Sequence, residues 1–203
     1  MAGALREAKA ASKREAHKFE ASGDFVERLE NPERMANMPS EEIVARIPIR
    51  KTDTLADLGA GIGYFTFPAA ERAKSVVAVD IEPAMLEVLS SRLRSRRVKN
   101  VLPLLGEILH MPLREGSVDG ILAACVYHEV DSQERLVTEC LRILRPGGIL
   151  TIVDFQKRKT SFGPPVRERK SPAQVIEVAG RNMRLVSRYD SPVFYQMSFM
   201  KTR

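Results

Sequence analysis

The stretch "DTLADLGAGIGYFTFPAAERAKSVVAVDIEP", residues 53–83, decides the fold of this chain. It contains two short apolar runs, "TLADL" and "SVVAVD", each with an aspartate at its end, and a glycine-rich turn follows the first run. Short β runs separated by a helical stretch are typical of a βαβ unit, in which two parallel strands are joined by a crossover helix. We therefore expect an α/β fold with a mostly parallel sheet.

The same alternation continues along the chain. Further β runs are "NVLPLL", "VDGILAACV" and "ILTIVDF", and helical patterns lie near residues 64–73, 83–97 and 132–144. The runs are nearly continuous in apolar residues, as expected when helices cover both faces of a sheet. After the helix "SPAQVIEVAGRN", the runs "MRLVSRYD" and "VFYQMSFM" are separated only by Ser191 and Pro192. They must pair as an antiparallel hairpin, because a parallel return needs a crossover of about a dozen residues or more. The sequence thus predicts seven strands.

Length and composition indicate one domain with a real core, since the chain has 203 residues, of which 44% are hydrophobic. No run approaches the roughly 18 apolar residues of a membrane span, and the first residues lack the apolar core of a signal peptide. We expect a cytoplasmic protein without a membrane partner. The two cysteines, Cys125 and Cys140, offer no disulfide framework, and we expect both to be buried. The three histidines lack metal-ligand spacing, so no metal site is expected.

The net charge is +6, with basic clusters over residues 9–18, 92–99 and 157–170. Such clusters can attract nucleic acid. Acidic residues are interspersed and aromatic residues are few, which favours the interpretation that the clusters are solvated helix faces and loops. A nucleic-acid partner is therefore possible but not favoured.

The glycine-rich turn has the spacing G-x-G-x-G, with Gly59, Gly61 and Gly63. Glycines here let the backbone come close to a ligand with its N–H groups exposed. A dinucleotide fold would prefer G-x-G-x-x-G and would rarely need an acid just before a loop that faces a pyrophosphate. Asp57 therefore argues against a dinucleotide.

A ligand with an amino acid end and a nucleoside end fits the two aspartates. Asp57 can hold an ammonium group, directly or through water, while the N–H groups of the glycine turn take the neighbouring carboxylate. Asp80 can accept hydrogen bonds from both hydroxyls of a ribose. Glu107 can accept the amino hydrogens of an adenine, which Ile81 and Ile108 can sandwich; the alternative is that Glu107 is an exposed loop acid. S-adenosylmethionine has both ends, and it is the cofactor that we predict.

With these residues the chain resembles the class I S-adenosylmethionine-dependent methyltransferases, of the small group similar to the ubiquinone/menaquinone C-methyltransferases. The matching pieces, in the family's order, are "DLGAGIGYF", "VVAVDIEPAMLE", "MPLREGSVDGIL", "HEV" and "LRILRPGGILTIVDF". The resemblance implies a Rossmann-like, doubly wound sheet with strand order 3-2-1-4-5-7-6. It also implies a methyltransferase domain over residues 39–203, preceded by a helical arm over residues 1–38.

The resemblance assigns Asp57, Gly59, Gly61, Asp80 and Glu107 to the cofactor, with Glu107 departing from the more usual aspartate. The full set of cofactor contacts that we expect is Asp57, Gly59, Ala60, Gly61, Gly63, Tyr64, Phe65, Asp80, Ile81, Met85, Glu107, Ile108 and Cys125.

The methyl acceptor should face the residues that follow strands four and five, because ligands of open α/β sheets lie beyond the carboxyl ends of the strands. The polar candidates for catalysis there are Tyr127, His128 and Glu129. His128 can take a proton near neutral pH, and Glu129 can orient it or bind a cationic substrate. The alternative is that His128 only hydrogen-bonds backbone. Asp154 can bond substrate or a loop amide, and the segment 163–165, "GPP", can stiffen a flap.

The acceptor class is constrained by absences. No Asn-Pro-Pro-aromatic tetrad follows the fourth β run and neither cysteine follows a proline, which disfavours nucleobase methylation. We therefore expect methyl transfer to a small molecule by in-line displacement. The alternatives are an RNA or protein methyltransferase that uses the basic clusters, and a non-catalytic S-adenosylmethionine-binding protein.

The arm carries apolar residues in an otherwise polar leader, among them His17, Phe19, Phe25 and Leu29. A solvating tail has no need of aromatic residues, so we expect the arm to fold over the site as a lid. The alternatives are a helix packed on the outer face of the sheet and an unfolded leader. A further helix follows the arm, with Ser40 as its expected cap.

Overall fold

The sheet has seven strands in the order β3-β2-β1-β4-β5-β7-β6, which confirms the expected strand order. This computed structural model describes residues 30–202, so most of the predicted arm, including His17, Phe19, Phe25 and Leu29, lies outside the described residues. The strands are β1 (Thr54–Leu58), β2 (Ser75–Asp80), β3 (Val101–Leu105), β4 (Val118–Ala124), β5 (Leu144–Phe155), β6 (Met183–Asp190) and β7 (Phe194–Lys201). The helices are α3 (Pro32–Asn37), α4 (Ser40–Ala45), α5 (Thr66–Arg72), α6 (Pro83–Ser95), α7 (Gln133–Ile143) and α8 (Pro172–Ala179).

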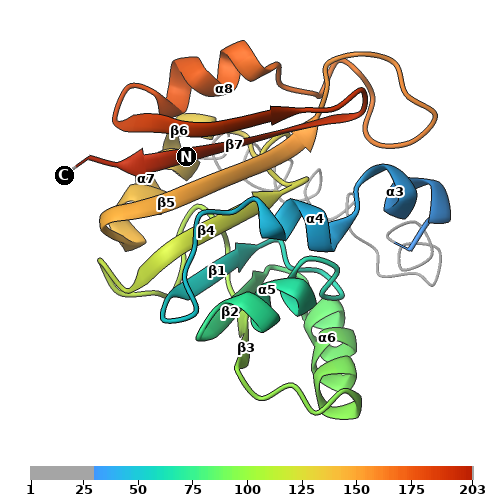
Figure 1. The fold of residues 1–203 in the computed structure, drawn as a ribbon, viewed down its shortest axis with the longest axis vertical. Helices are drawn as coiled ribbons and strands as arrows, with labels where there is room; N and C mark the ends of the chain where they lie inside the picture. Colours follow the sequence, from blue (N-terminus) through green and yellow to red (C-terminus); the bar gives the residue numbers. More distant parts are fainter. Residues whose placement is uncertain (1–29, 203) are drawn as a thin grey trace, which may run out of the picture.

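Strands β1 to β5 are parallel to one another, whereas β7 runs antiparallel to both β5 and β6. The predicted hairpin is therefore confirmed. The arrowheads of β1 and β5 point toward the side of the molecule where α3 lies (Figure 1). Ligand sites of open α/β sheets lie on this side, beyond the carboxyl ends of the parallel strands.

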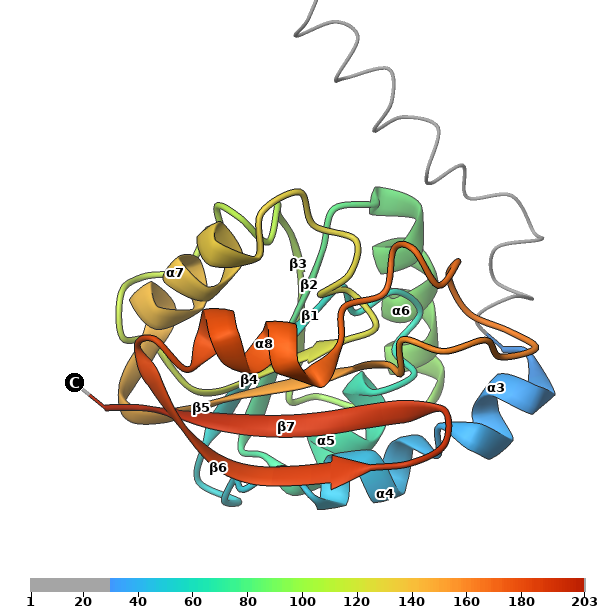
Figure 2. The same cartoon turned by 90° about the horizontal axis from the view of Figure 1, so that it is seen from above.

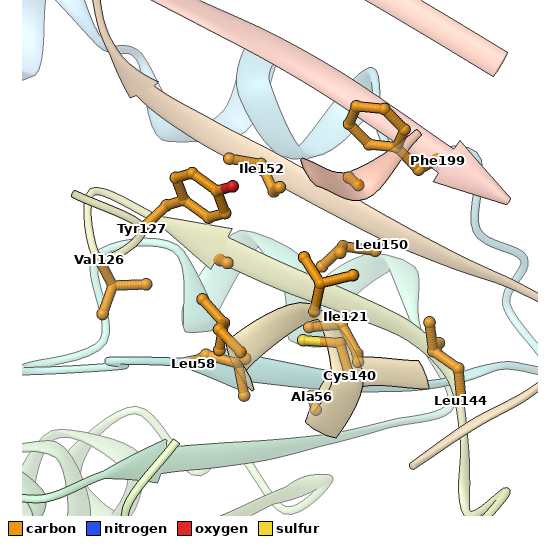
Figure 3. Packing of buried hydrophobic residues seen from close by; sticks show 14 of the residues in the cluster. Ala56, Leu58, Ile121, Val126, Tyr127, Cys140, Leu144, Leu150, Ile152 and Phe199 are labelled. Atoms are coloured by element: carbon orange, nitrogen blue, oxygen red, sulfur yellow. The ribbon is translucent and has the colours of Figure 1, made fainter. Parts of the chain in front are cut away.

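Helices cover both faces of the sheet, as the apolar β runs predict. Figure 2 shows α7 and α8 above the strands and α4 and α5 below them. The alternation of side chains along β1 explains the two layers, because Ala56 and Leu58 point into one core cluster and Leu55 into the other. Figure 3 shows the first cluster, where Cys140 of α7 lies among residues of β1, β4 and β5.

Three element boundaries differ from the sequence predictions. Ser40 does not cap α4, because Pro39 occupies the N-cap position and Ser40 is the first helical residue. The hydroxyl of Ser40 donates to the carboxylate of Glu41 instead of accepting a backbone N–H of the first turn. β4 ends at Ala124 because Cys125 has a left-handed φ of 58°. β5 begins as early as Leu144, because a register shift in the pairing of β4 with β5 absorbs the residues before Ile149.

Helix α3 was not predicted as a separate helix. Asn31 caps it, since its side-chain oxygen accepts the N–H groups of Glu33 at 2.8 Å and Arg34 at 3.1 Å, and Pro32 is the first helical residue. This Asn-Pro pair is a recognisable helix-start signal. The helices of residues 30–202 include none that is long and apolar enough to cross a membrane.

Candidate functional site

The turn between β1 and α5 has three left-handed residues, which explains its G-x-G-x-G spacing. The φ angles are 66° at Gly59, 53° at Gly61 and 97° at Gly63, and residues with a Cβ rarely adopt them. At Gly59 a Cβ would also lie 3.1 Å from the side chain of Val126, in the loop after β4. The sequence pattern therefore reflects both the bend of the chain and a close approach of two strand-end loops.

Three amides of this turn already have partners within the fold. Ala60 donates to the carbonyl of Val79 at 3.0 Å, Gly61 donates to the Oδ2 atom of Asp80 at 2.7 Å, and Gly63 donates to the carbonyl of Ala60 at 3.0 Å. The turn is thus held against the end of β2. These three amides were expected to receive a ligand carboxylate, but in the structure each donates a hydrogen bond within the protein.

Asp57 is the residue before the last of β1 and is a buried carboxyl, with 2% of its surface exposed. The hydroxyl of Thr66, at the start of α5, donates to its Oδ2 atom at 2.6 Å. Burial raises the pKa of Asp57 to about 7, and the nearby charge of Asp80 adds to this, while the bond from Thr66 acts in the opposite direction. A cationic ligand group beside Asp57 would stabilise its ionised form, so the site fits an ammonium group.

Asp80 ends the neighbouring strand β2 and is held by backbone N–H groups. Its Oδ1 atom accepts from Glu82 at 2.9 Å, and its Oδ2 atom accepts from Gly61. Burial raises the pKa of Asp80 in spite of these bonds. A carboxylate offers about four lone-pair sites, so these two bonds orient the group and leave it able to accept two hydroxyls.

The residues expected around an adenine form a partly open apolar edge. Ile81 is 59% exposed next to Asp80, and Ile108 is half-buried against the core. Glu107 has an exposed side chain, and its carbonyl accepts the N–H of His110 at 3.0 Å. The cofactor contact of Glu107 stays a prediction.

The other expected cofactor residues differ in burial. Ala60, Phe65 and Met85 are buried, with exposures of 7%, 6% and 3%, so their side chains belong to the core. Tyr64 is half-buried and extends toward α3, where its hydroxyl donates to the carbonyl of Met38 at 2.8 Å. Cys125 is half-buried, not buried as expected.

His128 and Asp154 meet at the ends of β4 and β5. The Nδ1 atom of His128 lies 2.8 Å from Oδ1 of Asp154, and the backbone N–H of His128 donates to Oδ2 at 3.0 Å. Asp154 is fully buried and also accepts the N–H of Phe155 at 2.7 Å. A carboxylate only accepts hydrogen bonds, so it directs the proton of the neutral ring to Nδ1 and leaves Nε2 as a proton acceptor.

Burial lowers the pKa of His128, but the hydrogen bond and charge of Asp154 outweigh burial, with further help from Glu129 and Glu168, so that the pKa is raised overall. The Oε1 atom of Glu129 lies 3.8 Å from Nε2 of His128. Asp154, rather than Glu129, is therefore the residue that orients the ring, and Glu129 adds negative charge on the Nε2 side of the ring.

Tyr127 lies in the core, apart from this pair. Its side chain is packed in the first core cluster, with Ile152 beside its ring in Figure 3. The residue is 1% exposed, and its hydroxyl has no hydrogen-bond partner among residues 30–202. Burial raises its pKa. The catalytic role of Tyr127 stays a prediction.

The loop after β5 is organised by Arg169, which the sequence analysis placed in a solvated basic cluster. Residues 157–159 are indeed exposed, but Arg169 is only 2% exposed. Its guanidinium donates to the carbonyls of Pro164, Gln156, Arg158 and Phe162 and to the hydroxyl of Thr160. The basic cluster is therefore only partly solvated. The "GPP" segment, residues 163–165, is held by the buried guanidinium of Arg169 through the carbonyl of Pro164.

The loop is also tied to the His128 pair by aromatic contacts. The ring of Phe162 packs edge-on against Phe155, at 6.0 Å between centroids, and Phe155 packs in the same manner against His128, at 6.1 Å. The loop after β5 thus forms a fixed wall beside His128.

Comparison with known proteins identifies the central part of the chain. Residues 56–152 match the model of a family described as "Methyltransferase domain". An uncharacterized methyltransferase of Mycobacterium tuberculosis is 42% identical over 115 residues, which cover 57% of this chain and 44% of the relative. A demethylmenaquinone methyltransferase of Symbiobacterium thermophilum is 31% identical over 125 residues, which cover 60% of this chain and 50% of the relative. The chain thus spans about half the length of these curated relatives.

A solved structure supports the fold over most of the chain. A SAM-dependent methyltransferase from Aquifex aeolicus superposes with a TM-score of 0.82 at 22% identity, covering 90% of this chain and 100% of that one. At this identity the likeness concerns the fold alone.

Proposed function

Residues 56–152 form a methyltransferase domain of the class I, S-adenosylmethionine-dependent type, and on this premise we propose that the protein transfers a methyl group from S-adenosylmethionine to a small-molecule acceptor. The observation that carries the proposal is the pair of buried strand-end carboxylates, Asp57 and Asp80, on either side of the left-handed glycine turn. We place the functional unit over residues 39–203, because β5 needs β7 as its partner.

The two aspartates divide the work of binding. Asp57 holds the ammonium group of the methionine end, and Asp80, oriented by Gly61 and Glu82, accepts the ribose hydroxyls. Ile81 provides an apolar surface for the base. These assignments follow from where the carboxyl ends of β1 and β2 place the side chains, and they account for an acid at the end of each strand.

The bound cofactor supplies a methyl group that is already activated by the positive sulfur. The chain therefore has to align the acceptor, exclude water and, where the acceptor is protonated, remove a proton. In the proposed in-line displacement the bound cofactor would supply the methyl group, and the acceptor atom would bond to the methyl carbon as the carbon–sulfur bond breaks and its electron pair goes to sulfur. The acceptor proton goes to Nε2 of His128, and the resulting imidazolium is stabilised by Asp154.

The neighbourhood of His128 favours a small acceptor. On one side lies the fixed loop after β5, which carries Phe162 toward Phe155, and the ring of His128 is only 6% exposed. A long polymer would have to enter a site whose base is largely covered. This confinement supports a small molecule over RNA or protein.

Methyl-labelled S-adenosylmethionine tests the proposal when it is mixed with separate small-molecule, RNA and protein fractions of a cell extract. We expect label in the small-molecule fraction with the wild type and none with Asp57→Asn. Label in the RNA or protein fraction would contradict the proposed acceptor class. Binding of S-adenosylhomocysteine without transfer to any fraction would point to a non-catalytic binding protein.

A further inference from the structure

Helix α3 lies outside the matched methyltransferase domain, yet it reaches the glycine turn. In Figure 1 it stands on the side to which the carboxyl ends of β1 and β5 point. The hydroxyl of Tyr64, which follows Gly63 in the turn, donates to the carbonyl of Met38 at 2.8 Å. On its other side α3 is tied to the loop after β5 by a hydrogen bond from Ser161 to Glu33. Helix α3 therefore spans the gap between the cofactor turn and the acceptor wall.

Arg34 is the residue of α3 that faces both strand-end loops. Its guanidinium carbon lies 5.0 Å from the centroid of the Tyr64 ring, after β1. Burial raises the pKa of the Cys125 thiol, after β4, while the charge of Arg34 and a side-chain hydrogen bond from it act to lower that pKa. The cation thus sits over the place where the loops after β1 and β4 approach each other, which is also where Gly59 comes close to Val126.

The charges around the turn explain why a cation belongs there. Asp57 and Asp80 are both acidic groups at this turn, and burial raises the pKa of each, so a nearby cation would stabilise their ionised forms. The amino acid end of S-adenosylmethionine brings an ammonium group, which suits Asp57, and a carboxylate, which these acids repel. The amides of Ala60, Gly61 and Gly63 already serve the fold.

We infer that Arg34 binds the carboxylate of the cofactor's methionine end, so that α3 completes the cofactor site from outside the methyltransferase domain. A guanidinium has five N–H donors in a planar fork that matches a carboxylate, so Arg34 can bind it while its face stays on Tyr64. This inference rests on the proposed function and deepens it, because it assigns the carboxylate of the cofactor, which Asp57 and Asp80 leave unmatched.

The affinities of three ligands, only one of which has the carboxylate, can distinguish a carboxylate contact of Arg34 from a structural role of α3. Calorimetry would compare S-adenosylhomocysteine, its decarboxylated analogue and 5′-methylthioadenosine on the wild type and on Arg34→Gln. We expect Arg34→Gln to weaken S-adenosylhomocysteine about ten- to a hundredfold, in keeping with the loss of a charged hydrogen bond. The other two ligands, which lack the carboxylate, should bind both proteins equally. Arg34→Lys, which keeps the charge without the fork, should restore part of the affinity.

Arg46→Gln is the matched control, because Arg46 is also a partly buried arginine of this region, and it pairs with Glu42 at 3.0 Å and stacks on Tyr189 of β6, the edge strand of the sheet. It should leave all three affinities unchanged. An equal loss for all three ligands on Arg34→Gln would assign Arg34 to the packing of α3 and overturn the inference, as would no loss for any. If the wild type itself does not bind S-adenosylhomocysteine, the proposed function fails first.

Discussion

The Nδ1 atom of His128 and the Oδ1 atom of Asp154 lie 2.8 Å apart, and this contact joins the carboxyl ends of β4 and β5. The carboxyl ends of neighbouring parallel strands lie at the same edge of a sheet. A histidine after one strand and an aspartate near the end of the next can therefore form a hydrogen bond. The pair combines a group that titrates near neutrality with a buried carboxylate that sets its orientation. It is the arrangement expected of a proton acceptor.

Replacement of His128 should slow methyl transfer and leave cofactor binding intact. General-base catalysis contributes roughly 10²- to 10⁴-fold, so we expect a loss of that order for His128→Gln at saturating S-adenosylmethionine. Since neutral His128 is the active form, the wild-type rate should rise with pH through its raised pKa. Asp154→Asn removes the charge that raises this pKa, so the rise should move to lower pH. A pH profile that is the same in all three proteins would exclude His128 as the base.

Binding of S-adenosylhomocysteine should strengthen as the pH rises through about 7, because only ionised Asp57 pairs with the ammonium group and burial raises its pKa to about 7. Below that pH the affinity should fall by up to about tenfold per pH unit. The stability of the free protein should change in the opposite direction. The folded protein binds the proton of Asp57 more tightly than the unfolded chain does, because the pKa is about 7 in the folded state and 3.8 in the unfolded state. This contribution to the free energy of unfolding is fully present below pH 3.8 and is lost as the pH rises through 7.

Calorimetry and thermal unfolding across this pH range check both trends. Asp57→Asn should flatten both, since an amide does not titrate. An affinity that is constant from acidic to neutral pH in the wild type would mean that Asp57 does not contact the ammonium group.

Asp80→Ala should weaken S-adenosylhomocysteine by roughly 1.5 to 3 kcal/mol, or about ten- to a hundredfold, because it removes a charged acceptor of ribose hydroxyls. Asp119→Ala is a suitable comparison, since Asp119 accepts the N–H of Thr54 at 2.8 Å and pairs with Arg145 near the opposite ends of these strands. That variant should lose stability without losing cofactor affinity. Equal dissociation constants of S-adenosylhomocysteine for Asp80→Ala and the wild type would mean that Asp80 only holds the glycine turn and does not contact the cofactor.

Tyr127→Phe should leave the free energy of unfolding unchanged or raise it by about 1 kcal/mol, because it removes a buried hydroxyl that has no partner among the described residues. Tyr195→Phe provides the contrast, since the hydroxyl of Tyr195 donates to the carbonyl of Lys170 at 3.0 Å, and its loss should cost about 1 kcal/mol. Denaturant titration measures both. A large drop in methyl transfer with Tyr127→Phe would support the catalytic role that the sequence suggested.

Much of the fold could be predicted because its signals are local. The apolar runs and the separation of the last two runs by Ser191 and Pro192 were enough for seven strands and an antiparallel hairpin, and both are confirmed. The strand order came from the resemblance to methyltransferases, since no local pattern encodes which strands become neighbours. Asp57 and Asp80 could be placed together because both lie at the carboxyl ends of adjacent parallel strands.

Features that depend on three-dimensional neighbours could not be predicted. Asp154 lies 26 residues from His128, and only the packing of β5 beside β4 shows that their side chains meet. Arg169 looked like one more charge in a basic cluster, yet its five donors all find acceptors in a loop whose shape the sequence does not reveal. Tyr127 follows a β run near the expected site, and only the structure shows that its side chain packs in the core.

The position of β7 between β5 and β6 has a consequence for how the protein is made. Ribosomes add about 5 to 20 residues per second, so β5 leaves the ribosome seconds before residues 194–201, which are its partner on that side. Until then the nascent chain carries an open strand edge and lacks the buried side chains of Tyr195, Met197 and Phe199. A premature stop or a protease cut before residue 194 should therefore yield an aggregating fragment that requires chaperones, rather than a smaller enzyme.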